Sequence, residues 1–343
     1  MLRCLTILML ASPFLRSQDI QSTCDASTST SLNQQGRDAV NEKRYEVALQ
    51  RLESAYAACS QDRAILLEIS RTQMLKRDFE QAIASAQKYL KQDPGSIPGM
   101  LTLADAYFMG QRLTEAREAA MQVLRAEPGN GAALKIKGNS EYLSGDVSAA
   151  TGTFIDLLDR HPADEEAAYM LGRIYYQEGM IDQSIGQFKR VLRINPRSHK
   201  AYDNLGLCYE AKGDNDTAIR YFLTAIKLVE KDHLDYDWAF ANLADLLLKA
   251  GDAEKAYGAA SQAVERNPNS ARDFYIGGKA LDQLGKVDLS LNWLQRSAAL
   301  DPNYPEPEYL LTQIYRRLGM QDKAEEARKR FLEAKAKSPS SRK

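Results

Sequence analysis

Prolines recur at a fixed spacing along most of the chain. Six of the 11 prolines lie at positions 94, 128, 162, 196, 268 and 302. The successive gaps are 34, 34, 34, 72 and 34 residues, and 72 is two periods plus four inserted residues. A fixed period of this length is typical of repeat architectures, in which each repeat is one supersecondary unit stacked on its neighbours. The chain is therefore expected to form an array of similar units.

A register follows if each of these prolines is position 32 of a 34-residue repeat, with repeats starting at 29, 63, 97, 131, 165, 199, 237, 271 and 305. Positions that were not used to set the register agree with it. Position 8 is small in every repeat: Gly36, Ser70, Ala104, Gly138, Gly172, Gly206, Ala244, Gly278 and Thr312. Position 20 is alanine or serine throughout, and position 15 is glycine in the last six repeats: Gly145, Gly179, Gly213, Gly251, Gly285 and Gly319.

Each recurrent position has a physical role in a pair of helices. Glycine at position 15 can adopt the left-handed conformation that ends a first helix. Proline at position 32 cannot continue the second helix. Small residues at positions 8 and 20 allow the two helices to approach closely, and larger apolar residues at positions 7, 11 and 24 form an apolar stripe around them.

The segment from Ala201 to Leu228, AYDNLGLCYEAKGDNDTAIRYFLTAIKL, resembles the tetratricopeptide repeat (TPR) family. Nine repeats over 29–338 cover most of the chain, and the first and last lack the proline, with Ser60 and Ala336 in its place. Weaker patterns are normal in terminal repeats, which face solvent on one side. The resemblance implies an all-α fold, a right-handed superhelical α-solenoid of helix-turn-helix units with a concave groove.

An irregular step separates the repeats that start at 199 and 237. Residues 230–236, EKDHLDY, lack the proline and add four residues. One interpretation is a longer connecting loop or an extra helical turn, and the other is a functional hinge or docking loop.

The N-terminus differs from the repeats. Arg3 precedes an apolar run from Cys4 to Leu15, and polar residues follow, which is the pattern of a secretory signal peptide over 1–18. No clear A-x-A cleavage triplet precedes the polar turn, so a mis-assigned start or a short hydrophobic cap on the array are alternatives. Residues 19–28 are rich in Ser and Thr and predict a flexible linker, and 339–343 predict a short tail. The sequence thus favours export to the periplasm, the cell envelope or the medium.

No pattern in the sequence indicates catalysis. Nucleotide-binding, serine-hydrolase and zinc-protease motifs are absent, and the three histidines are far apart. With 45 Lys and Arg against 46 Asp and Glu, the chain lacks the basic character of a nucleic-acid binder. We therefore expect no enzyme activity, no cofactor, no metal and no small-molecule substrate. From Arg316 onward the chain carries 10 Lys and Arg against 4 Asp and Glu. This end could contact an acidic partner or a membrane surface peripherally, and a capping helix explains the charges equally well.

The resemblance implies two classes of function. The first is a non-enzymatic scaffold outside the cytoplasm that holds a protein or peptide in its concave groove. The second is a co-chaperone-type adaptor whose repeats clamp the C-terminal carboxylate of a chaperone. Lys135, Asn139 and Lys200 match the clamp pattern of that family, whereas Met170 and Asn204 replace an expected Asn and Arg.

In this family the groove is built mainly by positions 2, 5, 6, 9, 12 and 13 of the first helices. The resemblance therefore implies a peptide-binding set in which aromatic rings alternate with amide and charged groups. Asn204 and Asn242 at position 6 are expected to grip the backbone of a partner, although several tyrosines could instead cover the seams between repeats. The set is Lys135, Asn139, Tyr142, Tyr169, Arg173, Tyr176, Lys200, Asn204, Trp238, Asn242, Asp245, Tyr275 and Lys279.

The cysteines allow one disulfide. Cys24 precedes the first helix of the first repeat, and Cys59 ends its second helix. Because the two helices of a pair run antiparallel, these ends share one edge, and an exported protein is expected to join them. Two unpaired thiols are the alternative. Cys208, at position 10, is expected to be a buried free thiol.

Overall fold

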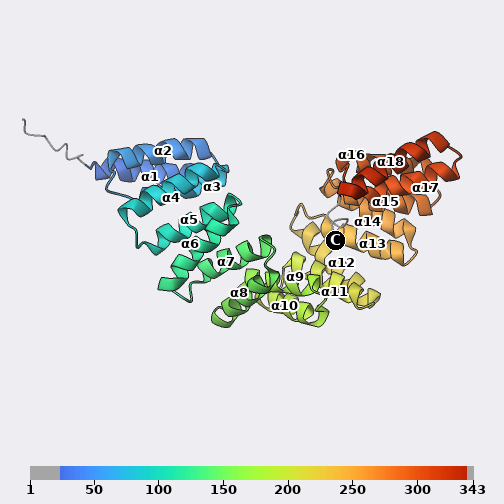
Figure 1. Ribbon diagram of the computed structural model, residues 1–343, viewed down its shortest axis with the longest axis horizontal. Helices are drawn as coiled ribbons and strands as arrows, with labels where there is room; N and C mark the ends of the chain where they lie inside the picture. The colour runs from blue at the N-terminus through green and yellow to red at the C-terminus, as the bar shows by residue number, and fades with distance from the viewer. Residues whose placement is uncertain (1–23, 338–343) are drawn as a thin grey trace, which may run out of the picture. The chain divides into compact units, whose positions relative to one another are not determined.

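The computed structural model describes residues 24–337, so the predicted signal peptide over 1–18 and the tail over 339–343 lie outside the described residues. All regular structure within 24–337 is α-helical, which confirms the expected all-α solenoid (Figure 1). The helices are α1 (Ala26–Asn41), α2 (Tyr45–Ala58), α3 (Ala64–Lys76), α4 (Phe79–Gln92), α5 (Ile97–Met109), α6 (Leu113–Ala126), α7 (Gly131–Leu143), α8 (Val147–Arg160), α9 (Glu165–Gln177), α10 (Ile181–Ile194), α11 (His199–Ala211), α12 (Asn215–Lys231), α13 (Trp238–Lys249), α14 (Ala253–Arg266), α15 (Ala271–Gln283), α16 (Val287–Leu300), α17 (Pro305–Arg317) and α18 (Gln321–Lys337).

The chain divides into two compact units, Met1–Asp146 and Val147–Lys343. Unit 1 contains α1 to α7 and unit 2 contains α8 to α18, so the division falls inside the fourth repeat. Within each unit, an odd-numbered helix packs against the even-numbered helix that follows it, and each such hairpin packs against the next along the chain. Within each unit, a repeat therefore contacts mainly its neighbours in sequence, as expected for a solenoid.

Position 8 is small because a side chain from the second helix lies directly on it. A Cβ atom added to Gly206 would lie 2.4 Å from Phe222, and one added to Gly172 would lie 2.9 Å from Phe188. Both phenylalanines occupy position 24 and are fully buried. The small residue thus provides the space that the large apolar residue fills, so positions 8 and 24 pack against each other as a pair.

Position 15 has a left-handed backbone throughout the array. Gly213, for example, has a φ of 77°, and the other five glycines of this position are also in the left-handed region. The first three repeats place Lys43, Arg77 and Gln111 at position 15, with φ values of 59°, 71° and 61°. The predicted end of the first helix is therefore confirmed even in repeats that lack the glycine.

The first helix begins earlier than the sequence indicated. Asp25 is its N-cap, because its side chain accepts a hydrogen bond from the amide of Thr28, with a donor–acceptor distance of 3.0 Å. The Asp25 amide in turn donates to the Ala58 carbonyl at 3.0 Å. The flexible linker expected over 19–28 is therefore wrong for its last residues, since 26–28 already form the first turn of α1.

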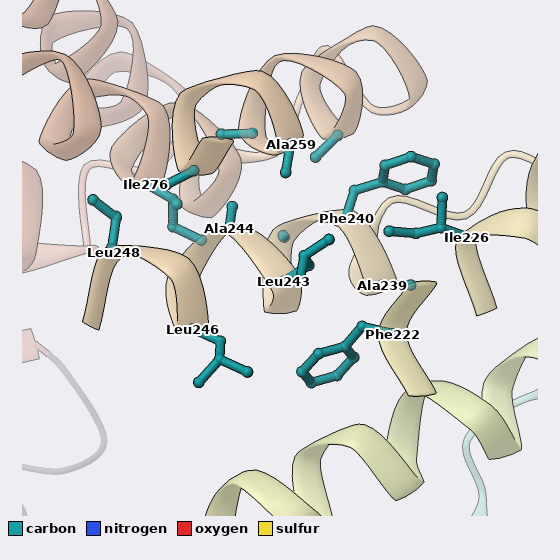
Figure 2. Packing of buried hydrophobic residues seen from close by; sticks show 14 of the residues in the cluster. Phe222, Ile226, Ala239, Phe240, Leu243, Ala244, Leu246, Leu248, Ala259 and Ile276 are labelled. Atoms are coloured by element: carbon teal, nitrogen blue, oxygen red, sulfur yellow. The ribbon is translucent and has the colours of Figure 1, made fainter. Parts of the chain in front are cut away.

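The largest apolar core of unit 2 lies between α12, α13, α14 and α15 (Figure 2). Phe222 from α12 and Phe240 from α13 are among its largest fully buried side chains. The inserted residues contribute to this core, because Leu234 and Tyr236 pack against it. The insertion also extends α12 to 17 residues, whereas α10 has 14. An extra helical turn followed by a short loop therefore accommodates the added residues.

No helix between residues 24 and 337 is both long enough and apolar enough to cross a membrane.

Candidate protein-binding face

The first helices of successive repeats lie next to one another in unit 2. Contacts join α9 to α11, α11 to α13, α13 to α15 and α15 to α17. Asn204 Nδ2 donates to Tyr169 Oη at 3.2 Å, and Asn242 Nδ2 donates to Asp203 Oδ1 at 2.9 Å. In both hydrogen bonds, position 6 of one repeat donates to position 5 of the repeat before it. We call the row formed by α9, α11, α13, α15 and α17 the inner row.

The predicted binding residues of unit 2 all lie on the inner row, but they differ in exposure. Lys200 and Trp238 are exposed, and Asn242 is buried. Three further predicted residues, Lys135, Asn139 and Tyr142, lie on α7 in unit 1, where they are half-buried. The other members in unit 2 are half-buried: Tyr169, Arg173, Tyr176, Asn204, Asp245, Tyr275 and Lys279.

The structure corrects the role expected of Asn242. Its side chain is only 3% exposed, and both ends of its amide are hydrogen bonded. Nδ2 donates to Asp203, and Oδ1 accepts from Arg272 Nη2 at 2.7 Å. Because breaking these bonds would leave buried polar groups without partners, Asn242 holds three repeats together rather than offering its amide to a ligand.

Asn204 is only partly available to a partner. Its Nδ2 donates to the Lys200 carbonyl at 2.8 Å as well as to Tyr169 Oη, and the side chain is half-buried. No other described residue donates to its Oδ1, so this oxygen can still accept a hydrogen bond from a peptide N–H.

A buried carboxylate, Asp203, lies at the centre of a polar network on the inner row. It is 2% exposed and accepts from Asn242 and from Tyr236 Oη at 2.6 Å. Burial raises the pKa of Asp203, and the two hydrogen-bond donors together with nearby Arg272 act in the opposite direction. Tyr236 belongs to the insertion, and its ring also meets the His199 ring edge-on at 4.7 Å between centroids. The insertion therefore closes the network over Asp203.

Aromatic rings remain accessible on the C-terminal half of the inner row. Trp238 is 55% exposed, and the Arg272 guanidinium lies 5.4 Å from its ring centre. The rings of Tyr275 and Tyr304 meet edge-on at 5.6 Å. Burial and the negative charges of nearby carboxylates raise the pKa of both tyrosines. Tyr309 on α17 is 52% exposed.

Ion pairs between positions 12 and 13 of consecutive repeats join neighbouring first helices. Lys249 Nζ lies 2.8 Å from Glu210 Oε1, and Arg317 pairs with Asp282. Basic residues on α18 also have acidic partners within the chain, since Arg330 Nε donates to Glu308 Oε1 at 2.6 Å. Part of the basic C-terminal stretch is therefore used for packing of the last repeats.

Four residues of this face, Asp203, Tyr236, Arg272 and Tyr309, were not among those predicted for it. Asp203 and Tyr309 occupy position 5, the position of Tyr169, so the register could have identified them. Tyr236 could not be found this way because it lies in the insertion, where the register is interrupted.

The described residues hold no assembly suited to metal chemistry. Across 24–337 no group of three or more His, Cys, Asp or Glu side chains is placed to hold a metal ion.

Two cysteines meet at the open edge of the first repeat. Cys24 and Cys59 are joined as a disulfide, with their Cα atoms 4.2 Å apart. The bridge links the start of α1 to the end of α2 in unit 1. Cys208 on α11 is a buried free cysteine 3.2 Å from Ser184 Oγ, and burial raises the pKa of its thiol. Its position agrees with the expectation from the repeat register.

Solved structures resemble this fold. A tetratricopeptide repeat protein from Parabacteroides merdae ATCC 43184 has 19% sequence identity and a TM-score of 0.58, with 74% of this chain and 99% of that chain covered. The APC/C hetero-tetramer Cut9-Hcn1 has 17% identity and a TM-score of 0.60, with 79% of this chain and 52% of that chain covered. A structure of MamA has 28% identity and a TM-score of 0.45, covering 48% of this chain and 96% of that chain. At 19% and 17% identity, the first two of these likenesses establish the fold alone. No curated protein matches the sequence.

Family models described as tetratricopeptide repeat or TPR repeat match along most of the chain. One matches residues 33–97 and again 242–305, and others match 73–139, 172–213 and 198–269. Together they cover 33–139 and 172–305, which include both compact units. Repeats of this kind form protein-interaction scaffolds. The chain belongs to the tetratricopeptide repeat family.

Proposed function

We propose that this protein is an exported, non-enzymatic scaffold that binds an extended protein segment along the inner row of unit 2. The exposure of Trp238 carries the proposal. A tryptophan that is 55% exposed on a first helix, with a guanidinium near its ring, is an apolar anchor that the protein itself does not bury. Tryptophan, tyrosine and arginine supply a large share of the binding energy at protein interfaces.

The neighbouring groups suit a peptide backbone and its side chains. Asn204 Oδ1 can accept a backbone N–H, and Tyr275 offers a hydroxyl beside the charged Asp245 and Lys279 on the same row. Tyr309 adds a second exposed ring on α17. The matching residues on α7, Lys135, Asn139 and Tyr142, extend the proposal to the equivalent face of unit 1. Aromatic anchors with polar neighbours match the composition of protein interfaces, in which a fully buried core is surrounded by a polar rim.

A selection from random peptides tests the proposal whatever the natural partner is. The peptides would be selected on the full mature chain, and the affinities of the selected peptides measured by fluorescence anisotropy. We expect Trp238→Ala to weaken binding by about 30-fold, the equivalent of about 2 kcal/mol for a central aromatic anchor. Leu223→Ala is the matched control, since Leu223 is 50% exposed on α12, a second helix. Equal losses in the two variants, or no loss in Trp238→Ala, would reject the inner row as the binding face.

A carboxylate clamp is the second candidate, and the residues favour it less. Lys200 and Asn204 lie on α11 and Met170 on α9, whereas Lys135 and Asn139 lie on α7 in the other unit. Asn204 replaces an arginine, the side chain best suited to hold a carboxylate by two hydrogen bonds. Selected peptides with free and amidated C-termini would decide between the two modes, because a clamp requires the free carboxylate.

Export is proposed from the N-terminal sequence and the cysteine pair together. A bridge between Cys24 and Cys59 persists only in an oxidising compartment. If the first 18 residues are removed, the mature chain keeps three of the four cysteines, and with the bridge only Cys208 is free. Thiol titration of the denatured secreted protein should then give one thiol per chain, and three thiols would contradict the bridge. N-terminal sequencing of the same material locates the cleavage site.

A further inference from the structure

One repeat carries a buried acid where the others carry small or apolar residues. Position 3 is Asp273 in the repeat that starts at 271, and the side chain is 1% exposed. An ionised carboxylate in such a place is costly, because burial removes its hydration. The fold does not need an acid there, since the other buried first helices have an apolar residue or glycine at position 3: Ile65, Gly99, Ala133, Ala167, Ala201, Ala239 and Pro307.

A second acid, Asp237, is directed at the same place. It is the N-cap residue of α13 and only 8% exposed, yet its side chain makes no capping hydrogen bond to α13. Its Oδ2 accepts a hydrogen bond from Asn267 Nδ2 at 2.8 Å. This bond joins positions 1 and 31 of the repeat that starts at 237. The same pairing occurs in the repeat that starts at 165, where Asn195 Nδ2 donates to Glu165 Oε1 at 3.0 Å. The pairing of positions 1 and 31 thus occurs in both repeats, and the acid at position 3 of the next repeat is what differs.

The carboxyl groups of Asp237 and Asp273 lie within hydrogen-bonding reach of each other. Asp273 Oδ2 is buried and has no other hydrogen-bond partner among the described residues. Two carboxylates this close cannot both be ionised without strong repulsion, whereas one proton between them makes a hydrogen bond. The hydrogen bond between the two carboxyl groups therefore forms only when the pair holds that proton.

The surroundings provide little positive charge to replace the proton. From α15, Ser270 and Arg272 face the pair, and from the C-terminal end of α14 comes the neutral Asn267. From α11 comes another acid, Asp203, whose carboxyl is close enough to Asp237 to be affected by its charge. The insertion contributes the neutral phenol Tyr236, which the charge of Asp237 affects. Arg266 on α14 stacks on Phe240, with its guanidinium 3.8 Å from the ring centre.

Arg272 is already engaged on the inner row. Its guanidinium donates to Asn242 Oδ1 and lies over the Trp238 ring. If the pair lost its proton, a second negative charge would attract Arg272 away from both contacts. Ionisation of the pair is thus coupled through one side chain to the exposed ring of α13.

We propose that Asp237 and Asp273 form a proton-operated latch in unit 2, which holds α13 against α15 when the pair carries one proton and loosens that seam when the proton leaves. Proton release leaves two carboxylates in a buried site, and Arg272 moves toward them from Asn242 and Trp238. The latch rests on unit 2 alone and does not depend on the proposed peptide binding.

The pH at which the latch opens follows from the environment of Asp273. Burial, then the charge of Asp237, raises the pKa of Asp273 from 3.8 to about 7, with Ser270 and Arg272 acting in the opposite direction. Folded Asp273 therefore binds its proton roughly a thousand times more tightly than an unfolded aspartate does. Its contribution to stability is complete below about pH 4 and is lost progressively as the pH rises to about 7. The seam is accordingly closed in mild acid and loosened above neutral pH.

Hydrogen exchange of the full chain tests the latch locally. After correction for the intrinsic pH dependence of exchange, we expect amides of 237–240 and 271–276 to exchange at least about tenfold faster at pH 8 than at pH 5.5. Asp273→Asn keeps a neutral donor in place of the protonated acid and should remove this difference. Asp273→Ala returns the position to the alanine of the four preceding repeats and should slow exchange at pH 8 relative to the wild type.

Glu165→Gln is the matched control, because Glu165 makes the same pairing with position 31, and position 3 of the next repeat is Ala201 instead of an acid. It should leave the pH dependence at 237–240 and 271–276 unchanged. Tryptophan fluorescence gives a second measurement: the wild type should show a transition near pH 7 that both Trp238→Phe and Asp273→Asn abolish. Equal exchange rates at the two pH values in the wild type, or a wild-type pH dependence that persists in Asp273→Asn, would overturn the latch.

Discussion

The first three repeats and the last six build the same turn from different residues. The last six place glycine at position 15, in a left-handed conformation that glycine adopts without steric cost. The first three adopt nearly the same backbone with Lys43, Arg77 and Gln111. A residue with a Cβ atom in this conformation costs roughly 1–2 kcal/mol. The packing of the two helices, and not the turn residue, therefore determines the path of the chain.

The two regions also differ in how each repeat is held together. In the repeat that starts at 199, the ring of Phe222 fills the space above Gly206. In the first repeat, the smaller Leu52 lies on Gly36, and the Cys24–Cys59 bridge joins the helix ends. The first repeat thus adds a covalent link to a leucine packed on glycine, whereas the repeats that start at 165 and 199 pack a phenylalanine ring against glycine.

The largest expected effect is in the later repeats. Phe222→Ala should reduce the stability of unit 2 by about 3–5 kcal/mol, because it removes a fully buried ring and leaves a cavity over Gly206. Urea unfolding followed by circular dichroism measures the loss. Leu223→Ala, on the neighbouring exposed residue, should change stability by less than about 0.5 kcal/mol. Similar losses in both variants would mean that packing against position 8 is not the main stabilising contact.

The bridge is expected to contribute most to the first repeat. The double variant Cys24→Ser, Cys59→Ser should destabilise α1 and α2 by roughly 3–4 kcal/mol in the chain-entropy model for a loop of this length. Hydrogen exchange should accelerate in α1 and α2 and stay unchanged in residues 165–228, since each repeat contacts mainly its neighbours. Unchanged exchange in α1 and α2 would show that packing alone holds the first repeat.

The buried network gives an intermediate effect that is confined to unit 2. Asn242→Ala leaves Asp203 and Arg272 each without one hydrogen-bond partner, and should lower the free energy of unfolding by about 1–3 kcal/mol. Asn204→Ala removes contacts that are only half-buried, and should lower the free energy of unfolding by a smaller amount. The two variants, compared by urea unfolding, distinguish a structural amide from an accessible one. A larger loss in Asn204→Ala would reverse that assignment.

The smallest effects test the turn itself. Gly213→Ala should destabilise its repeat by about 1 kcal/mol through the backbone alone, because a Cβ atom at Gly213 would meet no other atom within 4 Å. Arg77→Gly should stabilise the second repeat by about 0.5–1 kcal/mol, since relief of the left-handed strain exceeds the added flexibility of the unfolded chain. Faster local hydrogen exchange in Gly213→Ala together with slower local exchange in Arg77→Gly would support the comparison. A change in the same direction in both variants would contradict it.

The repeat register could be predicted because the same residue types recur at the same positions of each repeat for local structural reasons. Helix pairs, the small residues at position 8 and the left-handed turn at position 15 all follow from residues that recur every 34 positions. The start of α1 was predicted too late because Asp25 caps the helix among Ser and Thr residues that by composition resemble a linker.

The candidate face could be predicted only in outline. The register placed Trp238, Asn204 and Tyr275 correctly on first helices, but it gave Asn242 the same role as Asn204 because both occupy position 6. Their difference arises from neighbours in other repeats. Asp203 and Arg272 enclose Asn242, whereas Asn204 stays half-exposed beside Tyr169.

The sequence by itself determined the family, the all-α fold and the order of the helix pairs, since these depend on periodic positions whose requirements are local. Only the tertiary structure decided which side chains on the inner row are accessible, that the insertion brings Tyr236 onto Asp203, and that Asp237 lies close to Asp273. These contacts join residues about 33 to 39 positions apart through the packing of whole repeats. Burial, charge and hydrogen bonding at such contacts depend on three-dimensional proximity, which no single repeat encodes.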